Sequence, residues 1–277
     1  MKSINCNGTL INLSSPKVMG ILNNTPDSFF DGGKYNNPTA IVNHVEKMLS
    51  EGATFIDVGA YSSRPGAKHI SEEEELERIS PVIELLVQEF PKLLISVDTF
   101  RSEIANYCIN EGACIVNDIS AGSLDTKMFA TIAKLQVPYI IMHMQGTPQN
   151  MQAKPIYEDV IKEVLYYFSK KINELRSLGI NDIISDVGFG FGKTVNQNYD
   201  LLKHLDLFKN LEILTLVGLS RKSMLFKPLE ISQNEALNAT TSANTIALLN
   251  GANILRVHDV KEAVEAIKIV ELLNNNE

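Results

Sequence analysis

The chain has 277 residues, of which 44% are hydrophobic and 21% are charged, and its formal net charge is −8 at pH 7. This composition is typical of a soluble globular protein and excludes disordered, collagen-like and coiled-coil classes. The acidic balance argues against non-specific nucleic-acid binding, which requires a basic surface, but a local basic cluster can still bind an anionic small molecule.

The chain shows no sequence sign of export or membrane insertion. Its apolar runs fall short of the roughly 18 residues of a transmembrane helix, and the first twenty residues lack a signal-peptide pattern. The three cysteines, Cys6, Cys108 and Cys114, form no CxxC motif, and we interpret them as buried thiols in a reducing compartment. We therefore expect a cytoplasmic protein with neither a membrane nor a nucleic-acid partner.

Residues 3–13 are predicted to form a β-hairpin, with Asn7-Gly8 as its two-residue turn. From residue 18 onward, short β-branched apolar runs alternate with longer segments of helical periodicity. Near-continuous apolarity of this kind is typical of parallel strands that are buried on both faces. Eight strands are predicted at residues 18–22, 54–58, 93–97, 114–116, 139–142, 183–184, 214–217 and 254–257.

Each predicted strand is followed by a segment with helical spacing. The first helix has an apolar stripe that includes Ile41 and Val45, and the second has one that includes Ile79 and Ile83. Ser71-Glu72-Glu73-Glu74 fits a capping box, so we interpret the acidic run 72–75 as a solvated helix start rather than a metal site. Later helices are predicted at residues 102–111, 126–135, 157–178, 198–209, 235–250 and 261–273.

Eight β-α units predict an α/β fold, a closed (β/α)8 TIM barrel, since the chain slightly exceeds the roughly 250 residues usual for that fold. The alternative is a doubly wound open sheet, which usually has fewer strands and a glycine-rich phosphate turn after the first strand. We place the short N-terminal hairpin across the bottom of the barrel. No linker or repeat divides the sequence, so residues 1–277 are expected to form a single domain.

A polar side chain stands at the end of every predicted strand. In a (β/α)8 barrel those ends converge on one rim, where catalytic residues lie. One such residue would be interpreted as a helix cap, whereas eight at corresponding positions indicate a site. They are Asn23, Asp57, Asp98, Asn117 with Asp118, His143, Asp186, Ser220-Arg221-Lys222, and Arg256 with His258.

The rim residues favour two kinds of ligand group. Asp98, Asn117 and Asp186 present acceptors suited to a flat heterocycle that bears several N–H groups. Asn23 and Asp31 offer hard oxygen ligands for a Mg²⁺ ion held partly by substrate phosphate, and no Cys/His cluster suggests zinc. The basic side chains suit a phosphate or diphosphate. These are Arg64, Lys222, Arg256 and His258.

Three loops are rich in glycine and other turn residues. The length and glycines of residues 24–33 and 59–67 suit lids that close on a substrate and exclude water, with ordinary surface loops as the alternative. Residues 188–193 resemble a phosphate-binding loop but lack the spacing of a P-loop, so we do not expect a nucleotide site.

Seven motifs follow one another along the chain. They are Met19-Gly20-Ile21-Leu22-Asn23-Asn24-Thr25-Pro26-Asp27-Ser28-Phe29, Ser63-Arg64-Pro65-Gly66-Ala67, Ser96-Val97-Asp98-Thr99, Val116-Asn117-Asp118-Ile119, Gly188-Phe189-Gly190-Phe191-Gly192-Lys193, Ser220-Arg221-Lys222-Ser223 and Arg256-Val257-His258-Asp259. From about Val18 to Val260, they resemble the signatures of the dihydropteroate synthase family, in the family's order.

The resemblance implies a folate-pathway transferase. The family joins p-aminobenzoate to 6-hydroxymethyl-7,8-dihydropterin diphosphate, releases pyrophosphate with Mg²⁺ present, is the target of sulfonamides and is usually dimeric through barrel helices. A homodimer is therefore expected here. Departure of pyrophosphate would leave a cationic pterin methylene, so the site must neutralise the leaving group and exclude water. No covalent nucleophile is required.

The resemblance also implies a role for each matching position. The pterin-binding residues would be Asp98, Asn117, Asp186 and Lys222. The Mg²⁺ ligands would be Asn23 and Asp31. The residues that handle the diphosphate and loop closure would be Ser63, Arg64, Arg256 and His258. The p-aminobenzoate pocket would be formed by Pro65, Phe191, Lys222 and Ser223. The catalytic set would be Asp31, Arg64, Lys222, Arg256 and His258.

Several positions depart from the family's commoner pattern. Asn24 and Phe30 replace a usual Val and Ser, Val187 replaces a usual Pro, and Ala60-Tyr61 stands where Gly-Glu is frequent. Ser63 replaces a usual Thr but retains the hydroxyl that would contact the diphosphate.

Three other functions are open on sequence. A pterin-binding methyltransferase domain would share the barrel and the pterin-reading acids but would have little use for Arg64 or the Asp31 loop. A phosphosugar isomerase or aldolase would need a carbonyl-directed base or Schiff-base lysine, for which Lys222 is the candidate. A non-catalytic pterin-binding protein would be expected to lack Asn23 or Asp31, and the sequence has both.

Overall fold

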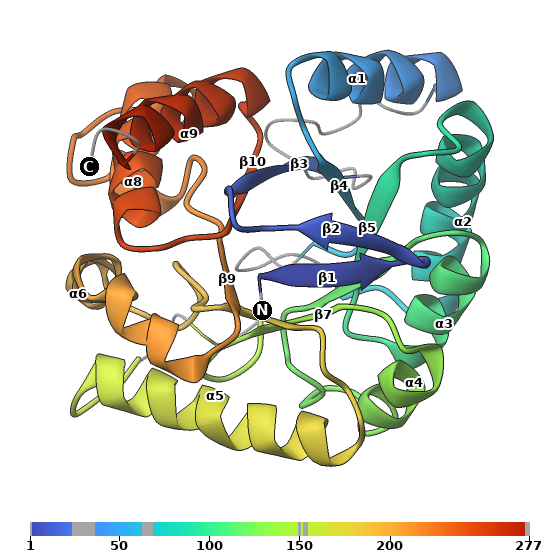
Figure 1. The fold of residues 1–277 in the computed structure, drawn as a ribbon, viewed down its shortest axis with the longest axis horizontal. Helices are drawn as coiled ribbons and strands as arrows, with labels where there is room; N and C mark the ends of the chain where they lie inside the picture. The colour runs from blue at the N-terminus through green and yellow to red at the C-terminus, as the bar shows by residue number, and fades with distance from the viewer. Residues whose placement is uncertain (1, 24–36, 63–68, 149–150, 152–154, 275–277) are drawn as a thin grey trace.

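The computed structural model describes residues 2–23, 37–62, 69–148, 151 and 155–274 (Figure 1). Eight parallel strands form a closed barrel in the order β10-β3-β4-β5-β6-β7-β8-β9. The barrel closes where β10 pairs with β3, with Arg256 opposite Met19. The closed barrel is therefore confirmed, and the open-sheet alternative is wrong. The strands are β3 (Lys17–Asn23), β4 (Phe55–Gly59), β5 (Leu94–Asp98), β6 (Ile115–Asp118), β7 (Tyr139–Met142), β8 (Ile183–Asp186), β9 (Leu214–Val217) and β10 (Ile254–Val257).

Helices surround this barrel (Figure 1). Their apolar faces pack on the outer faces of the strands and form the largest hydrophobic cluster of the described residues. The α-helices are α1 (Pro38–Ser50), α2 (Glu72–Glu89), α3 (Ser102–Asn110), α4 (Met128–Leu135), α5 (Val160–Ser177), α6 (Val195–Lys203), α7 (Ser223–Phe226), α8 (Leu237–Leu249) and α9 (Val260–Asn274). Two 3₁₀ helices are η1 (Leu205–Leu211) and η2 (Gln233–Glu235). No helix of the described residues is long and apolar enough to cross a membrane.

Two predicted helices differ most from the observed ones at their ends. The helix predicted at 157–178 begins at Val160, because the Asp159 carboxylate caps it by accepting hydrogen bonds from two backbone N–H groups. The helix predicted at 198–209 is divided into α6 and η1, which meet at His204. A capping box between Thr194 and Gln197 starts α6 earlier than predicted.

The hairpin lies across the barrel opening that faces the viewer in Figure 1. Its strands, β1 (Ser3–Cys6) and β2 (Thr9–Asn12), pair in antiparallel fashion. Asn7 and Gly8 both have positive φ, 49° and 81°, as a type I′ turn requires. The Asn5 N–H donates to the Asp182 carboxylate at 2.8 Å, just before β8 begins. The prediction of a hairpin at the bottom of the barrel is confirmed.

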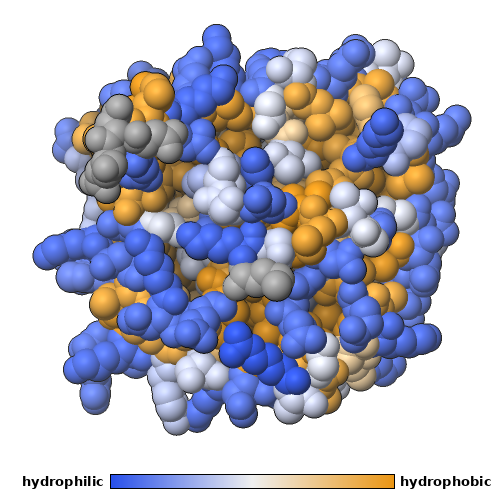
Figure 2. All heavy atoms as spheres, in the orientation of Figure 1, coloured by the Kyte–Doolittle hydropathy of each residue, from blue (hydrophilic) through white to orange (hydrophobic). Residues whose placement is uncertain are grey.

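Apolar side chains fill the barrel beneath the hairpin. Ile4, Cys6 and Leu13 from the N-terminal segment are almost completely buried against inward-facing strand residues such as Met19 and Phe55. Seen from this side, the outer surface is a mixture of hydrophilic and hydrophobic residues (Figure 2). This end of the barrel is therefore closed by hydrophobic packing, and the polar strand ends lie at the other end.

Candidate active site

Strand register brings the predicted polar residues together at the carboxyl end of the barrel. Asn23 pairs with Gly59, Gly59 pairs with Asp98, and Asp98 pairs with Asn117 across four neighbouring strands. A Cβ added to Gly59 would lie 3.6 Å from Asp98 Oδ2 and 3.7 Å from Asn23 Oδ1. The missing side chain at Gly59 therefore leaves room for the Asn23 and Asp98 oxygens to share one space.

Arg256 is the centre of a buried charge network on this side of the rim. Its Nε donates to Asp57 Oδ2 at 2.6 Å, and its Nη2 donates to Asp98 Oδ2 at 2.8 Å. Asn117 Nδ2 donates to the same Asp57 oxygen at 3.1 Å. Asp57 is completely buried, and its other oxygen, Oδ1, has no hydrogen-bond partner among the described residues. Sequence reasoning placed Asp57 at the rim but gave it no role.

Burial and neighbouring charge act in opposite directions on this network. Burial raises the pKa of Asp98 to about 7, although the Arg256 charge lowers it. Burial lowers the pKa of Arg256, but Asp57 and Asp98 raise it by more, so the guanidinium stays charged. The carboxylates of Asp57 and Asp98 thus share one cation, the Arg256 guanidinium. Their remaining oxygen lone pairs can accept hydrogen bonds from N–H donors of a ligand.

Asp186 and Lys222 face each other on the opposite side of the rim. Asp186 Oδ2 and Lys222 Nζ each lie 3.9 Å from the position that a Cβ on Gly218 would occupy. The other Asp186 oxygen accepts the Gly188 N–H at 2.8 Å. Burial raises the pKa of Asp186, against the effect of Lys222. Burial also lowers the pKa of Lys222 to about 8, although Asp186 raises it.

Lys222 also contacts the loop after β8. Its ammonium donates to the backbone carbonyl of Phe189 and lies 4.7 Å from the centre of the Phe191 ring. This distance is in the range of a cation–π interaction. The structure therefore brings together Asp186, Lys222 and Phe191, while Ser223 begins the short helix α7 and is exposed.

The loop after β9 is fixed by contacts with the end of β10. The Ser220 hydroxyl lies 2.9 Å from His258 Nδ1 and accepts the His258 N–H at 3.2 Å. Arg221 has φ of 54°, in the left-handed region that favours glycine, and donates two 2.8 Å hydrogen bonds to Asp259. These contacts hold the backbone that presents Lys222.

Two strand-end residues serve the fold rather than the site. Asp118 accepts hydrogen bonds from Ser120, Gly122 and the Tyr139 hydroxyl, so its carboxylate is fully engaged within the protein. The His143 ring packs edge-on against Tyr167, a residue of α5. The interpretation that both belong to the converging set is therefore wrong.

The interpretation of residues 72–75 as a solvated helix start is wrong for Glu75. Its side chain is completely buried, forms an ion pair with Arg101 and accepts a hydrogen bond from the Thr99 hydroxyl at 2.7 Å. The sequence did contain a signal, because Glu75 lies four residues before Ile79 and thus on the buried face of α2. Ser71 does cap this helix by accepting the Glu74 N–H.

Four predicted site residues lie outside the described residues. They are Asp31, Ser63, Arg64 and Pro65. The two loops predicted to act as lids, residues 24–33 and 59–67, fall mostly there as well. Their roles stay predictions.

The described donor atoms fit a Mg²⁺ ion that arrives with its substrate. The part of the chain that the structure describes holds no group of three His, Cys, Asp or Glu side chains able to bind a metal ion alone. Asn23 supplies an amide oxygen and Asp98 a carboxylate oxygen, and both lie within 4 Å of the Cβ position on Gly59. Because Mg²⁺ keeps several waters and commonly combines one or two protein oxygens with substrate phosphates, this sparse donor set suits it.

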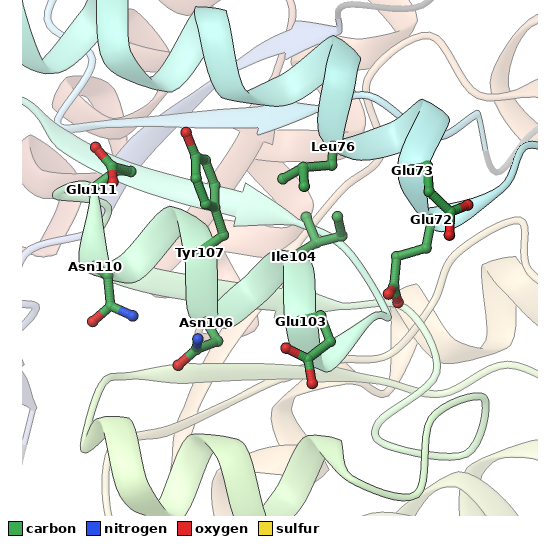
Figure 3. A pocket seen from close by; sticks show the side chains of 9 residues that line it. All are labelled: Glu72, Glu73, Leu76, Glu103, Ile104, Asn106, Tyr107, Asn110 and Glu111. Carbon is green, nitrogen blue, oxygen red and sulfur yellow. The ribbon is translucent and has the colours of Figure 1, made fainter.

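A separate hollow lies on the outside of the barrel, between α2 and α3 (Figure 3). It has a volume of about 480 Å³ and is lined by residues that include Glu72, Glu73, Glu103 and Glu111. Tyr107 stands among them and donates to Glu84 at 2.7 Å. None of the predicted site residues lines this hollow.

Comparison with known proteins identifies the relatives of this chain. Residues 19–258 match the family of pterin binding enzymes. Dihydropteroate synthase from Escherichia coli strain K12 is 46% identical over 266 residues, which cover 95% of this chain and 94% of that protein. The enzyme of the same name from Haemophilus influenzae is 42% identical and covers 97% of this chain and 98% of that one.

Solved structures agree with the sequence comparison. The Yersinia pestis dihydropteroate synthase in complex with a sulfonamide drug superposes with a TM-score of 0.95 at 42% identity, covering 99% of both chains. The Xanthomonas albilineans enzyme in complex with 7,8-dihydropteroate has a TM-score of 0.86 at 34% identity, covering 98% of both. Fold, rim chemistry and family match define a pterin-binding barrel enzyme.

The chain belongs to the dihydropteroate synthase family, whose members are transferases. The resemblance predicted from the seven motifs is thus confirmed. These matches favour the synthase over the methyltransferase, isomerase and aldolase alternatives considered above.

Proposed function

We propose that this chain condenses 6-hydroxymethyl-7,8-dihydropterin diphosphate with p-aminobenzoate, giving 7,8-dihydropteroate and pyrophosphate, and that it does so as a single domain. The observation that carries the proposal is the convergence of three acceptors and two cations on one barrel rim in a member of this family. The acceptors are Asp98, Asn117 and Asp186, and the cations are Lys222 and Arg256.

The pterin ring is expected to bind between the two sides of the rim. Asp186, held on one oxygen by the Gly188 N–H, would accept hydrogen bonds from the 2-amino group and N3–H with its remaining capacity. Asn117 and Asp98 would bind other polar atoms of the ring. Binding would compensate the cost of keeping these carboxylates buried.

The diphosphate would lie beside the basic residues of the rim. Arg256 and His258 would contact its oxygens, with Ser63 and Arg64 added from the second loop. Ser220 holds His258 at the rim through contacts with its Nδ1 and its backbone N–H. Asn23 and Asp31 would be the protein ligands of a Mg²⁺ ion, which when bound supplies positive charge to stabilise the leaving pyrophosphate.

The reaction exchanges one bond for another at the pterin methylene. The carbon–oxygen bond to the diphosphate breaks and its electron pair leaves with pyrophosphate. The amine nitrogen of p-aminobenzoate then forms the new carbon–nitrogen bond and loses a proton. The chain's tasks are to neutralise the leaving group and to keep water from the cationic carbon. Apolar side chains near the mouth support the second task, namely Ile119, Met142, Met144 and Phe191.

The p-aminobenzoate pocket is proposed at Phe191, Lys222, Ser223 and Pro65. The cation–π contact between Lys222 and the Phe191 ring supports this proposal, because it gives the pocket an aromatic surface next to Lys222. In support, the Xanthomonas albilineans neighbour, at 36% identity and TM-score 0.90, was solved with 4-aminobenzoic acid.

We also propose that the chain is a cytoplasmic homodimer. Two adjacent helices, α8 and α9, carry well-exposed apolar side chains that a second copy would cover. They are Ile246, Leu249, Ile269, Leu272 and Leu273. All three cysteines are free and buried, in keeping with a reducing compartment. Sedimentation of the chain would give its oligomeric state.

Pyrophosphate release from the pterin diphosphate tests the proposed reaction. Release is expected to require p-aminobenzoate and Mg²⁺ and to yield one 7,8-dihydropteroate per pyrophosphate. Tight pterin binding without release would indicate a non-catalytic binding protein instead. Release that does not depend on the arylamine would indicate hydrolysis and would overturn the proposed acceptor.

A further inference from the structure

The segment from Gly188 to Lys193 folds tightly against the end of β7. Gly188, Gly190 and Gly192 all have positive φ, of 71°, 80° and 60°. A Cβ on Gly188 would lie 2.0 Å from the His143 carbonyl oxygen, and one on Gly192 would lie 2.7 Å from the Gln145 carbonyl oxygen. The loop therefore has no space to shift toward β7, and its shape depends on the hydrogen bonds that its backbone carbonyls accept.

The Lys193 ammonium lies at the centre of this loop. It donates to the carbonyl oxygens of His143, Gly188 and Phe191 at 3.1, 2.9 and 3.0 Å. All three N–H donors of the ammonium are thus used, and the residue is 3% exposed. Burial lowers the pKa of Lys193 to about 7, against the effect of Asp186. A buried cation without a hydrogen-bonded carboxylate is costly, so filling space alone does not explain a lysine here.

The two aromatic residues of the loop depend on Lys193 to different degrees. The Phe189 side chain is completely buried in the main core, and its carbonyl accepts from Lys222. Phe191 is only half-buried and packs at the edge of a small apolar cluster, so its position depends more on backbone contacts than that of Phe189 does. Its N–H donates to the Gly188 carbonyl at 3.1 Å, and its own carbonyl accepts from Lys193. Lys193 bonds both of those carbonyls.

We propose that Lys193 is a positioning residue of the arylamine pocket, whose ammonium ties the Phe191 backbone to the ends of β7 and β8. The inference rests on the proposed function, since it takes Phe191 as part of the p-aminobenzoate site. The Lys193 side chain is buried under residues 188–191, and its ammonium donates its hydrogen bonds to backbone carbonyl oxygens. Its hydrogen bonds therefore affect the reaction through the Phe191 ring. Its charge also lowers the pKa of Asp186, but by less than the charges of Lys222 and Arg256 do.

Two substitutions separate this role from a general effect on folding. Lys193→Met keeps the length of the side chain and removes every donor, while Lys193→Gln keeps an amide with two N–H donors. Lys203→Met, an exposed lysine in the last turn of α6, is the matched control. Pyrophosphate release is measured while p-aminobenzoate and the pterin diphosphate are varied separately, and pterin affinity is measured by calorimetry.

Lys193→Met is expected to raise KM for p-aminobenzoate about tenfold, the size of one hydrogen bond to a charged group. Pterin affinity is expected to stay within about threefold, because Phe189 and the Lys222 contact are held by the core. Lys193→Gln should give a smaller rise, and Lys203→Met none. Equal losses in pterin affinity and in arylamine KM would overturn the proposal, as would a lowered melting temperature with normal KM.

A double substitution tests the path through Phe191 and does not require Lys193→Met to fold. In the Phe191→Ala background, Lys193→Gln should no longer change KM for p-aminobenzoate. An unchanged effect in that background would overturn the proposal. Failure of the proposed function would be recognised separately, because the unmodified chain would then release no pyrophosphate with p-aminobenzoate.

Discussion

The two ends of the barrel differ in the interactions that hold them together. At the hairpin end, Ile4, Leu13, Met19 and Phe55 are buried with almost no exposed surface, and apolar contact accounts for the packing. At the rim end, Asp57, Asp98, Asp186, Lys193 and Lys222 hold buried or half-buried charge.

Left-handed backbone occurs at both ends. Asn7 and Gly8 adopt it at the hairpin, and Arg221 and the three glycines of the loop after β8 adopt it at the rim. An unpartnered carboxylate oxygen of Asp57 lies there as well. In (β/α)8 barrels one face provides stability and the other provides activity, and here the rim carries the carboxylates and cations that are proposed to bind ligands.

Leu13→Ala is the strongest test of the hairpin end. Leu13 is fully buried, and its N–H donates to the Lys2 carbonyl at 2.7 Å, so truncation leaves a cavity beneath an anchored backbone. We expect the free energy of unfolding to fall by about 2–5 kcal/mol. Pterin affinity of the folded protein should stay within about twofold. Urea unfolding and calorimetric titration measure the two quantities, and a parallel loss of affinity would show that the two ends are coupled.

Asp186→Asn is the corresponding test at the rim. The change keeps the side-chain shape but turns an acceptor oxygen into an NH₂ group that faces ligand donors. Hydrogen bonds to charged groups contribute roughly 1.5–3 kcal/mol each, so pterin affinity should fall about ten- to a thousand-fold.

Stability should respond to Asp186→Asn in the opposite direction from Leu13→Ala. Burial raises the pKa of Asp186, which means that the ionised carboxylate is unfavourable in the folded chain. Replacing it should leave the melting temperature level or higher. A lowered melting temperature with near-normal pterin affinity would instead make Asp186 a structural residue.

Asp31→Ala extends the comparison to the first loop, which lies outside the described residues. As a proposed Mg²⁺ ligand that acts when the diphosphate leaves, Asp31 should affect the transition state more than the bound pterin. We expect turnover to slow at least about tenfold with pterin affinity retained. An equal loss of pterin binding would assign Asp31 to ground-state binding or to structure.

The sequence predicted the rim better than it predicted which rim residues face inward. Asn117 and Asp118 are adjacent on β6, and because side chains alternate along a strand, they point to opposite faces. Asn117 reaches Asp57 in the barrel, whereas Asp118 reaches Tyr139. The barrel could be predicted from hydrophobic periodicity, and the hairpin from its Asn7-Gly8 turn. Both patterns depend on residues that are close together in the sequence.

Lys193 and Glu75 could not be recognised as buried from residue type. Both look like solvated charges, because Lys and Glu are seldom fully buried. The partners of Lys193 are backbone carbonyls, which every residue supplies, so no complementary residue marks the contact in the sequence. Glu75 pairs with Arg101, which lies 26 positions away and is brought near by the fold.

The smallest expected effect concerns His143, where a rim residue serves stability. Burial and the Lys193 charge lower the pKa of His143 to about 3, although a backbone hydrogen bond raises it. The folded chain therefore keeps this ring neutral, whereas the unfolded chain takes up a proton near the ordinary value of about 6.5. Between those values the unfolded state binds more protons, so this contribution to stability is complete above pH 6.5 and is lost as the pH falls toward 3.

His143→Phe should remove that acid sensitivity while keeping an aromatic ring against Tyr167, whose centroid lies 4.9 Å away. The substitution also removes Nδ1, a buried atom without a hydrogen-bond partner among the described residues. From pH 7 to pH 5.5 the unmodified chain should lose about 1 kcal/mol more unfolding free energy than the variant, the amount expected for one histidine. Urea unfolding at both pH values measures this difference. Equal losses in the two proteins would show that His143 is protonated in the folded chain, which would require a polar partner for its ring and would make it a candidate site residue after all.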